Sequence, residues 1–392
     1  MDIAVSRTKN LIGTTLLITG CCIGAGMIGL PVMSAAAGFI PTTLAMVLCY
    51  FFATGTGLLL LEATLWFDER VNLLTMAQFA LGKYGKLITG LLFLFLFYCL
   101  SVAYIDAGGA LFGGALSMLF QYPVERVAAI ACFIVFVGAI IYGGIGAASR
   151  INTFFLFGLA VTYCVLLSLG LPHVKSAQLL NTDWKAALYT LPILLICFGF
   201  QNLVPTLVYY AKKDVSVLRT AIFVGNLIPF LIYFLWNFVI LGILPDDTAL
   251  LQQAKSQGSM VTHLLEKVSE SPLVLLFANL FSFFALLTSF VPNLITFVDF
   301  LKDGLKTRSY VLIYLLVLLP PTLFTLTSPH LFLKSLSLAG GFADVLLFGV
   351  LPVCIVWVGR YVKKIEGAYK APGGKAFLVA ILLFSIGMLC IK

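Results

Sequence analysis

The chain has 392 residues, of which 61% are hydrophobic and only 10% are charged, and its mean hydropathy is +1.09. This composition is typical of an all-α membrane protein that crosses the bilayer several times, and it excludes a soluble enzyme. The net charge of +8 lies in loops between apolar segments. It therefore reflects membrane topology and does not indicate a nucleic-acid-binding surface.

Apolar runs of the length that crosses a bilayer as a helix predict a single transmembrane domain over residues 1–392, with about 11 transmembrane helices. We expect these helices, in chain order, at residues 11–37, 42–67, 88–119, 127–147, 152–171, 187–210, 219–244, 272–300, 309–327, 331–358 and 376–391. With the N-terminus in the cytoplasm, 17 of the 24 lysine and arginine residues fall on the cytoplasmic side and 7 outside. The positive-inside rule favours this orientation.

Two of these helices are interrupted by glycine and proline, at residues 24–31 (GAGMIGLP) and 197–205 (CFGFQNLVP). A break frees backbone N–H and C=O groups that need water or a ligand, and paired breaks mark the binding sites of transporters. Their places in the first and sixth helices fit an inverted repeat of five helices at about 11–171 and five at about 187–358. One extra helix follows at about 376–391. Either break alone is explained as well by the general frequency of glycine and proline in membrane helices.

Four carboxylates lie inside predicted helices, where an ionisable group is costly and often functional. They are Glu62, Asp106, Asp299 and Asp344. Asp299 is close to the cytoplasmic edge, where an interfacial ion pair explains it. Asp106 follows Tyr104 and precedes two glycines, so a phenol, a carboxylate and a close backbone approach share one level of that helix. Asp106 is therefore the preferred candidate for proton coupling and Glu62 the second, with a structural role as the alternative.

The eighth predicted helix carries Ala285, Thr288 and Ser289 on one face, at spacings of i, i+3 and i+4. Such a face could line an ion site, although small hydroxyl residues also serve helix packing in membranes. The nine cysteines and three histidines show no metal-ligand spacing. We therefore expect neither a metal nor another cofactor.

Other function classes find little support in the sequence. The chain has no Gly-x-x-x-x-Gly-Lys-Ser/Thr motif, which argues against ATP-driven transport. It shows neither the filter repeat of a channel nor the nucleophile and base of an intramembrane enzyme, so both are weak alternatives to a transporter. The longest outer loop, at 245–271, is either an outer lid or a solvated surface helix. No obligate protein partner is evident.

Several motifs together resemble the hydroxy and aromatic amino acid permeases, a family of the amino acid/polyamine/organocation superfamily. The resemblance covers nearly the whole chain and includes the number of helices. It rests on residues 24–31, Leu61-Glu62, residues 72–76, Tyr104-Ile105, Phe198-Gly199-Phe200, Val204-Pro205 and Thr288-Ser289-Phe290.

This resemblance implies a LeuT-type fold with a 5+5 inverted repeat, broken first and sixth helices, and proton-driven amino acid uptake across a bacterial inner membrane. It implies that the backbone of the two breaks and the tyrosine of the third helix hold the α-amino and carboxylate groups. The substrate-binding residues implied are Gly24, Ala25, Gly26, Met27, Ile28, Tyr104, Cys197, Phe198, Gly199, Phe200 and Gln201. The face of Ala285, Thr288 and Ser289 matches the one that binds sodium in sodium-coupled members of this fold, so the coupling ion is H⁺ or Na⁺. Gln201-Asn202 departs from the histidine and small residue of many relatives, which could shift selectivity.

The residues themselves agree with a zwitterionic substrate. No acidic residue lies in the first or sixth helix, so a cationic ligand would find no partner charge there, whereas backbone dipoles can hold a zwitterion. Phe198, Phe200, Tyr104 and Phe283 or Phe284 could wall a slot for an aromatic ring. We predict proton-coupled import of aromatic amino acids, tyrosine first, by alternating access. Tryptophan, phenylalanine or a broader set of neutral amino acids, with sodium coupling, are the alternatives. The expected partners are the amino acid and the lipid bilayer.

Overall fold

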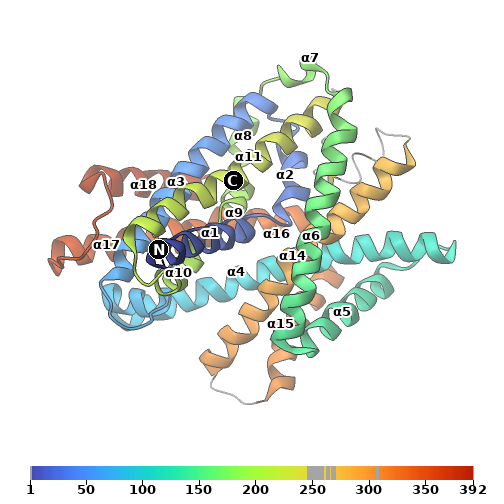
Figure 1. Cartoon of the computed structure of the whole chain (residues 1–392). Coiled ribbons are helices and arrows are strands. Elements are labelled where there is room, and N and C mark those ends of the chain that lie inside the picture. The colour runs from blue at the N-terminus through green and yellow to red at the C-terminus, as the bar shows by residue number, and fades with distance from the viewer. Residues whose placement is uncertain (1, 245–259, 262–264, 266–270, 306–308, 392) are drawn as a thin grey trace.

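The computed structural model describes residues 2–244, 260–261, 265, 271–305 and 309–391, and these residues form helices joined by loops (Figure 1). The predicted outer loop at 245–271 lies largely outside the described residues. The helices of the first half are α1 (Asp2–Cys22), α2 (Gly26–Ser34), α3 (Phe39–Leu65), α4 (Leu73–Phe120), α5 (Arg126–Tyr142), α6 (Gly144–Gly170), α7 (Ser176–Leu179) and α8 (Trp184–Leu188). Those of the second half are α9 (Leu191–Cys197), α10 (Val204–Tyr210), α11 (Val215–Ile243), α14 (Pro272–Leu305), α15 (Tyr310–Thr327), α16 (Phe332–Leu338), α17 (Leu351–Trp357) and α18 (Gly374–Leu389).

The π-helical segment η3 (Ala339–Val350) joins α16 to α17, and a second one, η4 (Val358–Val362), extends α17, so that together they form one long helix, Phe332–Val362. The short 3-10 segment η1 (Leu171–His173) follows α6, and a second one, η2 (Gln201–Leu203), precedes α10. The Phe332–Val362 helix corresponds to the tenth predicted span.

Each of the eleven predicted ranges contains an apolar helix within the described chain. By length and composition, seven of the described helices can cross a membrane, or eight when the bent pair of α1 and α2 counts as one span. The apolar helices at α5, α15 and α18 are shorter. The all-helical membrane architecture is thus confirmed, whereas the number of eleven crossings stays a prediction.

The two halves of α3 differ in what surrounds them. In the first half, apolar side chains such as Leu44, Leu48 and Phe51 are exposed, as expected for a membrane helix that faces lipid on one side. From Phe52 to Thr64 every residue is buried. Because protein surrounds this second half, Glu62 within it needs an internal partner for its charge.

Helix α4 is longer than the predicted range of 88–119. It begins after Asn72, whose side chain accepts a hydrogen bond from the N–H of Thr75 at 2.9 Å and so caps the helix. It bends at Gly82, where φ is +70°, a conformation that a residue without a Cβ adopts readily. The apolar part of α4 follows this bend.

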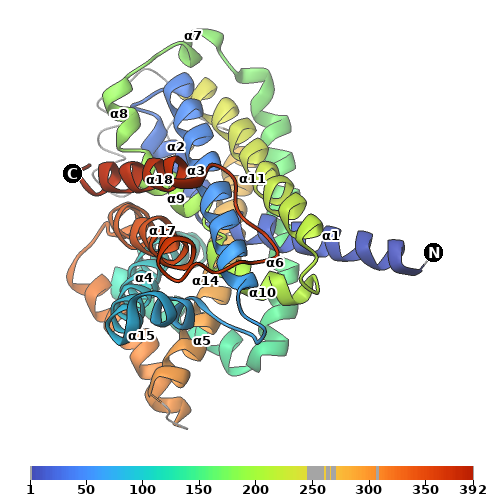
Figure 2. The same ribbon diagram turned by 90° about the vertical axis from the view of Figure 1, so that its left-hand side faces the viewer.

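The helices pack in two groups. One contains α1, α2, α3, α9, α10 and α11, and the other contains α4, α5, α14 and α15. Helix α6 packs mainly on α14, while the Phe332–Val362 helix contacts members of both groups. Figure 2 shows the N-terminal part of α1 projecting from the rest of the molecule. This grouping is what a LeuT-type inverted repeat would give, and that repeat stays a prediction.

Candidate functional site

The two predicted breaks lie next to each other. Helices α1 and α2 meet at a bend of 55°, and residues 198–203 separate α9 from α10. The thiol of Cys21 donates a hydrogen bond to the carbonyl oxygen of Gly199 at 3.4 Å. A Cβ on Gly26 would lie 2.5 Å from Cys197 Sγ, so only glycine allows α2 to approach α9 this closely. The sequence thus brings the breaks of the first and sixth predicted helices into contact.

Side chains from two other helices hold the first break in place. On α11, the hydroxyl of Tyr233 donates to the carbonyl oxygen of Cys22 at 2.8 Å, and the indole N–H of Trp236 donates to a carbonyl in α2 at 2.7 Å. On α14, the hydroxyl of Ser289 accepts from the N–H of Ala25 at 2.9 Å. Backbone groups freed in an apolar interior need such partners. The break is therefore a fixed part of the fold.

A cavity of about 430 Å³ lies beside the breaks, within the range of about 300–1,000 Å³ that is usual for small-molecule sites. It extends along α1 to Leu16 and Leu17, toward the N-terminal end of that helix. The aromatic side chains that line it are Phe93, Phe97, Tyr104 and Phe348, and the polar ones are Asn152, Asn202, Thr288, Ser289, Asn293, Thr296 and Asp344.

Some of the predicted substrate-binding residues line this cavity and others do not. The lining residues are Gly24, Ala25, Gly26, Tyr104, Cys197 and Gly199. The other five, Met27, Ile28, Phe198, Phe200 and Gln201, are buried against neighbouring helices. Gln201, for example, donates a hydrogen bond to Thr56 Oγ1 on α3 at 3.2 Å. Substrate contact by any of them stays a prediction, and the geometry favours the first set.

The aromatic wall of the cavity comes from α4 and the Phe332–Val362 helix, and not from the breaks themselves. The ring of Phe198 stacks on a phenylalanine of α11 at 6.5 Å. The ring of Phe200 packs on α3, where a Cβ on Gly57 would lie 2.8 Å from it. Phe283 and Phe284 pack against α6. The sequence predicted aromatic residues around the site but could not tell which rings face it.

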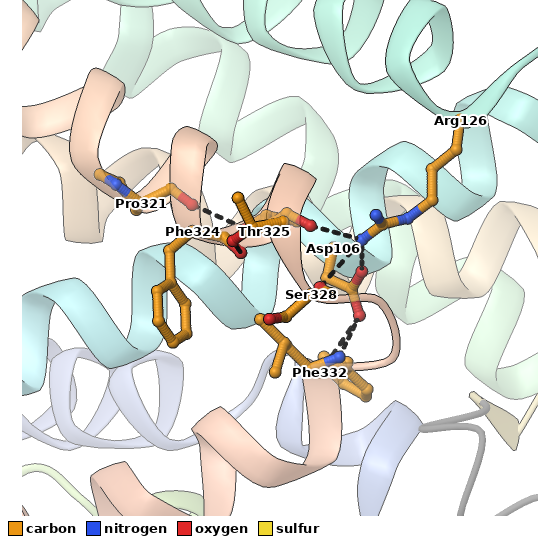
Figure 3. Close-up of polar contacts among 9 residues, drawn as sticks. Asp106, Arg126, Pro321, Phe324, Thr325, Ser328 and Phe332 are labelled. Carbon is orange, nitrogen blue, oxygen red and sulfur yellow. Dashed lines mark hydrogen bonds and ion pairs between the residues drawn. The ribbon is translucent and has the colours of Figure 1, made fainter.

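Asp106, the preferred candidate for proton coupling, lies outside the lining of the cavity, and its carboxylate accepts three hydrogen bonds (Figure 3). Its Oδ1 accepts from Arg126 Nη2 at 2.8 Å, and its Oδ2 accepts from the N–H groups of Leu331 and Phe332 at 2.7 and 3.0 Å. Arg126 also donates to the carbonyl oxygen of Thr325 at 2.8 Å. The carboxylate therefore caps the start of α16 and ties it to α4 and α5.

Glu62, the second candidate, is paired with Arg360. Its Oε1 accepts from Arg360 Nε at 2.7 Å, and its Oε2 accepts from Arg360 Nη2 and, at 2.6 Å, from the N–H of Ala371. Arg360 also donates to the carbonyl oxygen of Ala371 at 2.8 Å. Both charged side chains are almost fully buried, at 2% and 4% exposed. This bidentate pair joins α3 to the end of the Phe332–Val362 helix and to the loop before α18.

Asp344, which sequence analysis ranked below Asp106, is the carboxylate that lines the cavity. Its side chain is buried in the π-helical segment η3, and within the described residues it makes no hydrogen bond or ion pair. A Cβ added to Gly199 would lie 3.6 Å from Asp344 Oδ2, so the carboxyl group reaches the second break. The expectation that the breaks lack an acidic partner holds for their own segments but not for the folded chain.

The sequence contains a signal that Asp344 lies close to another helix. Small residues precede Asp344 at Ala339, Gly340 and Gly341, and they let η3 approach α9 closely. A Cβ on Gly341 would lie 3.2 Å from Pro192 Cβ. Because Asp344 follows this glycine pair within four residues, it is brought next to the backbone of another helix.

The hydroxyl face also lies at the cavity, through Thr288 and Ser289. Thr288 Oγ1 donates to the carbonyl oxygen of Ala285 at 3.0 Å, and Ser289 Oγ accepts from the N–H of Ala25 as described above. Across the cavity, Asn152 Oδ1 on α6 is buried without a hydrogen-bond partner in the described chain. Sequence analysis did not select Asn152, although a lone asparagine inside an apolar helix was the available signal. A sodium site at the hydroxyl face stays a prediction.

Comparison with known proteins gives a consistent picture. The model of the tryptophan/tyrosine permease family matches residues 7–392. A tryptophan-specific transport protein of Haemophilus influenzae is 29% identical over 97% of this chain and 94% of its own length. The tyrosine-specific transport system 1 of the same organism is 30% identical over 96% and 95%. Glutamine transporter 2 of Aliivibrio fischeri is 27% identical over 97% and 98%.

Proposed function

The chain belongs to the tryptophan/tyrosine permease family, and from this premise we propose that it imports aromatic amino acids, tyrosine first, together with protons. Membership of this family and the many apolar helices make it a multi-pass amino acid transporter of the bacterial inner membrane. The relatives named for tyrosine and tryptophan support an aromatic substrate.

The observation that carries the proposal is the cavity between the two broken helices. Helix α2 begins at this cavity, so the positive end of its dipole can bind the substrate carboxylate. The rings of Phe93, Phe97, Tyr104 and Phe348 can pack against an aromatic side chain. Since no lysine or arginine is among the described lining residues, a second negative charge on the substrate would have no partner. A neutral, ring-bearing amino acid fits this chemistry best.

Transport would proceed by alternating access in a LeuT-type fold. We take the N-terminus to be cytoplasmic, as the distribution of basic residues predicts. With this orientation, the cavity, which reaches Leu16 and Leu17 on α1, would lead toward the cytoplasm, as in an inward-facing state. The group that contains α1, α2 and α9 to α11 would move against the group of α4, α5, α14 and α15 to expose the site outward.

Two alternatives have specific support. The relative named as a glutamine transporter favours a broader or different neutral substrate. The hydroxyl face of Ala285, Thr288 and Ser289 favours sodium as the coupling ion. In either case the same two breaks would hold the α-amino and carboxylate groups.

The test is uptake of labelled tyrosine into proteoliposomes that contain the purified protein, under an imposed inward proton gradient and without sodium. Tryptophan, phenylalanine, leucine and glutamine serve as competitors. We expect accumulation that a protonophore abolishes and that only the aromatic amino acids inhibit. Accumulation that requires sodium would refute proton coupling, and inhibition by glutamine alone would refute the aromatic substrate.

A further inference from the structure

Among the described residues that line the cavity between the breaks, one has a carboxyl group and none is a lysine, arginine or histidine. Asp344 is the only charged side chain among the described residues that line it. The side chain is 5% exposed, so little water can solvate a negative charge on it. A carboxyl group in this setting is either neutral or accompanied by a cation.

The groups that surround Asp344 do not supply that cation. Tyr104 on α4, Cys21 on α1 and Cys197 on α9 line the same cavity, and all three are neutral in their protonated forms. On its own helix, Lys334 is exposed two and a half turns away and Arg360 is bound to Glu62. Three other elements that pack on η3 carry titratable side chains. These side chains are Cys354 on α17, Cys49 on the part of α3 near η3, and Lys375 on α18, which lies over the ring of Tyr361.

The position of the carboxyl group links it to the moving part of the site. A Cβ on Gly199 would have Asp344 Oδ2 at 3.6 Å and the carbonyl oxygen of Ile196 at 3.2 Å. The carbonyl oxygen of Ile196, at the end of α9, accepts from the N–H of Gly199 at 3.1 Å, so the carboxyl group and the last turn of α9 flank the same glycine of the second break. A protonated carboxyl can donate a hydrogen bond to such a carbonyl, whereas a carboxylate is repelled by it. Its protonation can thus change how the break sits against the Phe332–Val362 helix.

The closed site must also be balanced in charge. The proposed substrate is a zwitterion without net charge, so one negative group in the cavity requires one additional positive charge when the site is closed to water. We propose that Asp344 binds the coupling proton, which it takes from the outer side with the amino acid and releases to the cytoplasm. This inference rests on the proposed function, and it predicts that one positive charge crosses the membrane with each amino acid.

The first experiment compares Asp344→Asn with the parent protein in proteoliposomes. We expect Asp344→Asn to bind tyrosine and to exchange internal for external tyrosine, but to lose accumulation against a gradient and stimulation by an inside-negative membrane potential. The matched control is Asp299→Asn, an exposed carboxylate at the end of α14, which should accumulate tyrosine like the parent. Asp344→Glu, which keeps the titrating group, should recover part of the accumulation.

The second experiment does not depend on the substrate. Infrared difference spectra of the purified protein between neutral and alkaline pH, where exposed carboxyl groups stay ionised, should show the carbonyl band of a protonated carboxylic acid. This band should vanish in Asp344→Asn and persist in Asp299→Asn. If the parent accumulates no amino acid while the band behaves as expected, the proposed function fails and the proton site stands.

Three results would overturn the proposal. Accumulation that survives in Asp344→Asn would exclude Asp344 as the proton carrier. Loss of tyrosine binding in a variant that is monodisperse and thermally stable would assign Asp344 to the substrate ammonium group instead. An infrared band that persists in Asp344→Asn would place the titrating carboxyl elsewhere.

Discussion

At both ends of the Phe332–Val362 helix a carboxylate from another helix is matched by an arginine. Asp344, in the middle of the helix, lines a cavity whose described residues include no lysine or arginine. At the start, Asp106 binds Arg126 and two backbone N–H groups. At the end, Glu62 binds Arg360 and one backbone N–H. The helix is thus anchored at its two ends, and its middle is left with an uncompensated acid.

This difference separates two uses of the same functional group. In a low-dielectric interior, a carboxylate whose acceptor positions are filled holds elements together, and removal of one partner leaves a buried charge. A carboxyl group that has no partner can exist there as the neutral acid and exchange a proton with water when the site opens. We therefore propose that the same sequence signal, an acid in an apolar helix, marks a structural role for Asp106 and Glu62 and a functional role for Asp344.

The largest effect is expected where the pair is most deeply buried. Arg360→Met removes the partner of Glu62 and should lower the free energy of unfolding by about 3–5 kcal/mol, because an unpaired carboxylate is left in the interior. Thermal unfolding in detergent, followed by size-exclusion chromatography, measures this loss.

The control for this variant is Lys364→Met, which removes an exposed cation nearby and should leave stability unchanged. The double variant Glu62→Gln/Arg360→Met should recover much of the loss, since no charge then stays unpaired. Equal instability of the double and single variants would show that the unpaired carboxylate does not cause the loss of stability and would break the comparison.

A smaller effect is expected at the other end of the helix. The Arg126 side chain is 37% exposed, and Asn in place of Asp106 keeps one acceptor, so Asp106→Asn should cost about 1.5–3 kcal/mol of stability. Gradient-driven accumulation of tyrosine should persist in the folded fraction. Lost accumulation at unchanged stability would instead indicate that Asp106, the candidate that the sequence favoured, binds the coupling proton.

The outcome at these acids shows what a sequence can reveal about such a site. The breaks at 24–31 and 197–205 were found because glycine and proline have a direct backbone effect, and the fold brings them together. The intramembrane acids were also found, because their cost in lipid is a property of the residue itself. Their partners were not, since Arg126 and Arg360 were assigned to loops by their position in the chain.

The direction in which a side chain points could not be predicted from the sequence either. Phe198 and Phe200 lie in the second break, yet their rings pack on α11 and α3. Phe93 and Phe348 were not selected but line the cavity from helices that are distant in sequence. Which face of a helix meets the site depends on the packing of the whole bundle, and periodicity is uninformative where all faces are apolar.

A moderate effect on selectivity is expected from the aromatic wall. Phe348→Leu keeps an apolar side chain but removes a ring, and loss of one ring contact of about 0.5–1.5 kcal/mol should weaken competition by tyrosine about 2- to 12-fold. Competition by leucine should change little. Phe198→Leu is the matched control, because its ring is buried behind the break and its loss should alter stability without altering selectivity.

The smallest effect is expected at the hydroxyl face. The hydroxyl of Thr288 already donates to Ala285 on its own helix, so it is not needed to satisfy another group. Thr288→Ala should therefore change stability by about 0.5 kcal/mol or less and leave sodium-independent uptake close to that of the parent. If sodium were the coupling ion, the same substitution would remove one of its oxygen ligands and raise the sodium concentration needed for uptake. Since Asp344 and Thr288 line the same cavity, measuring sodium dependence in Thr288→Ala and proton dependence in Asp344→Asn decides which side of the cavity binds the coupling ion.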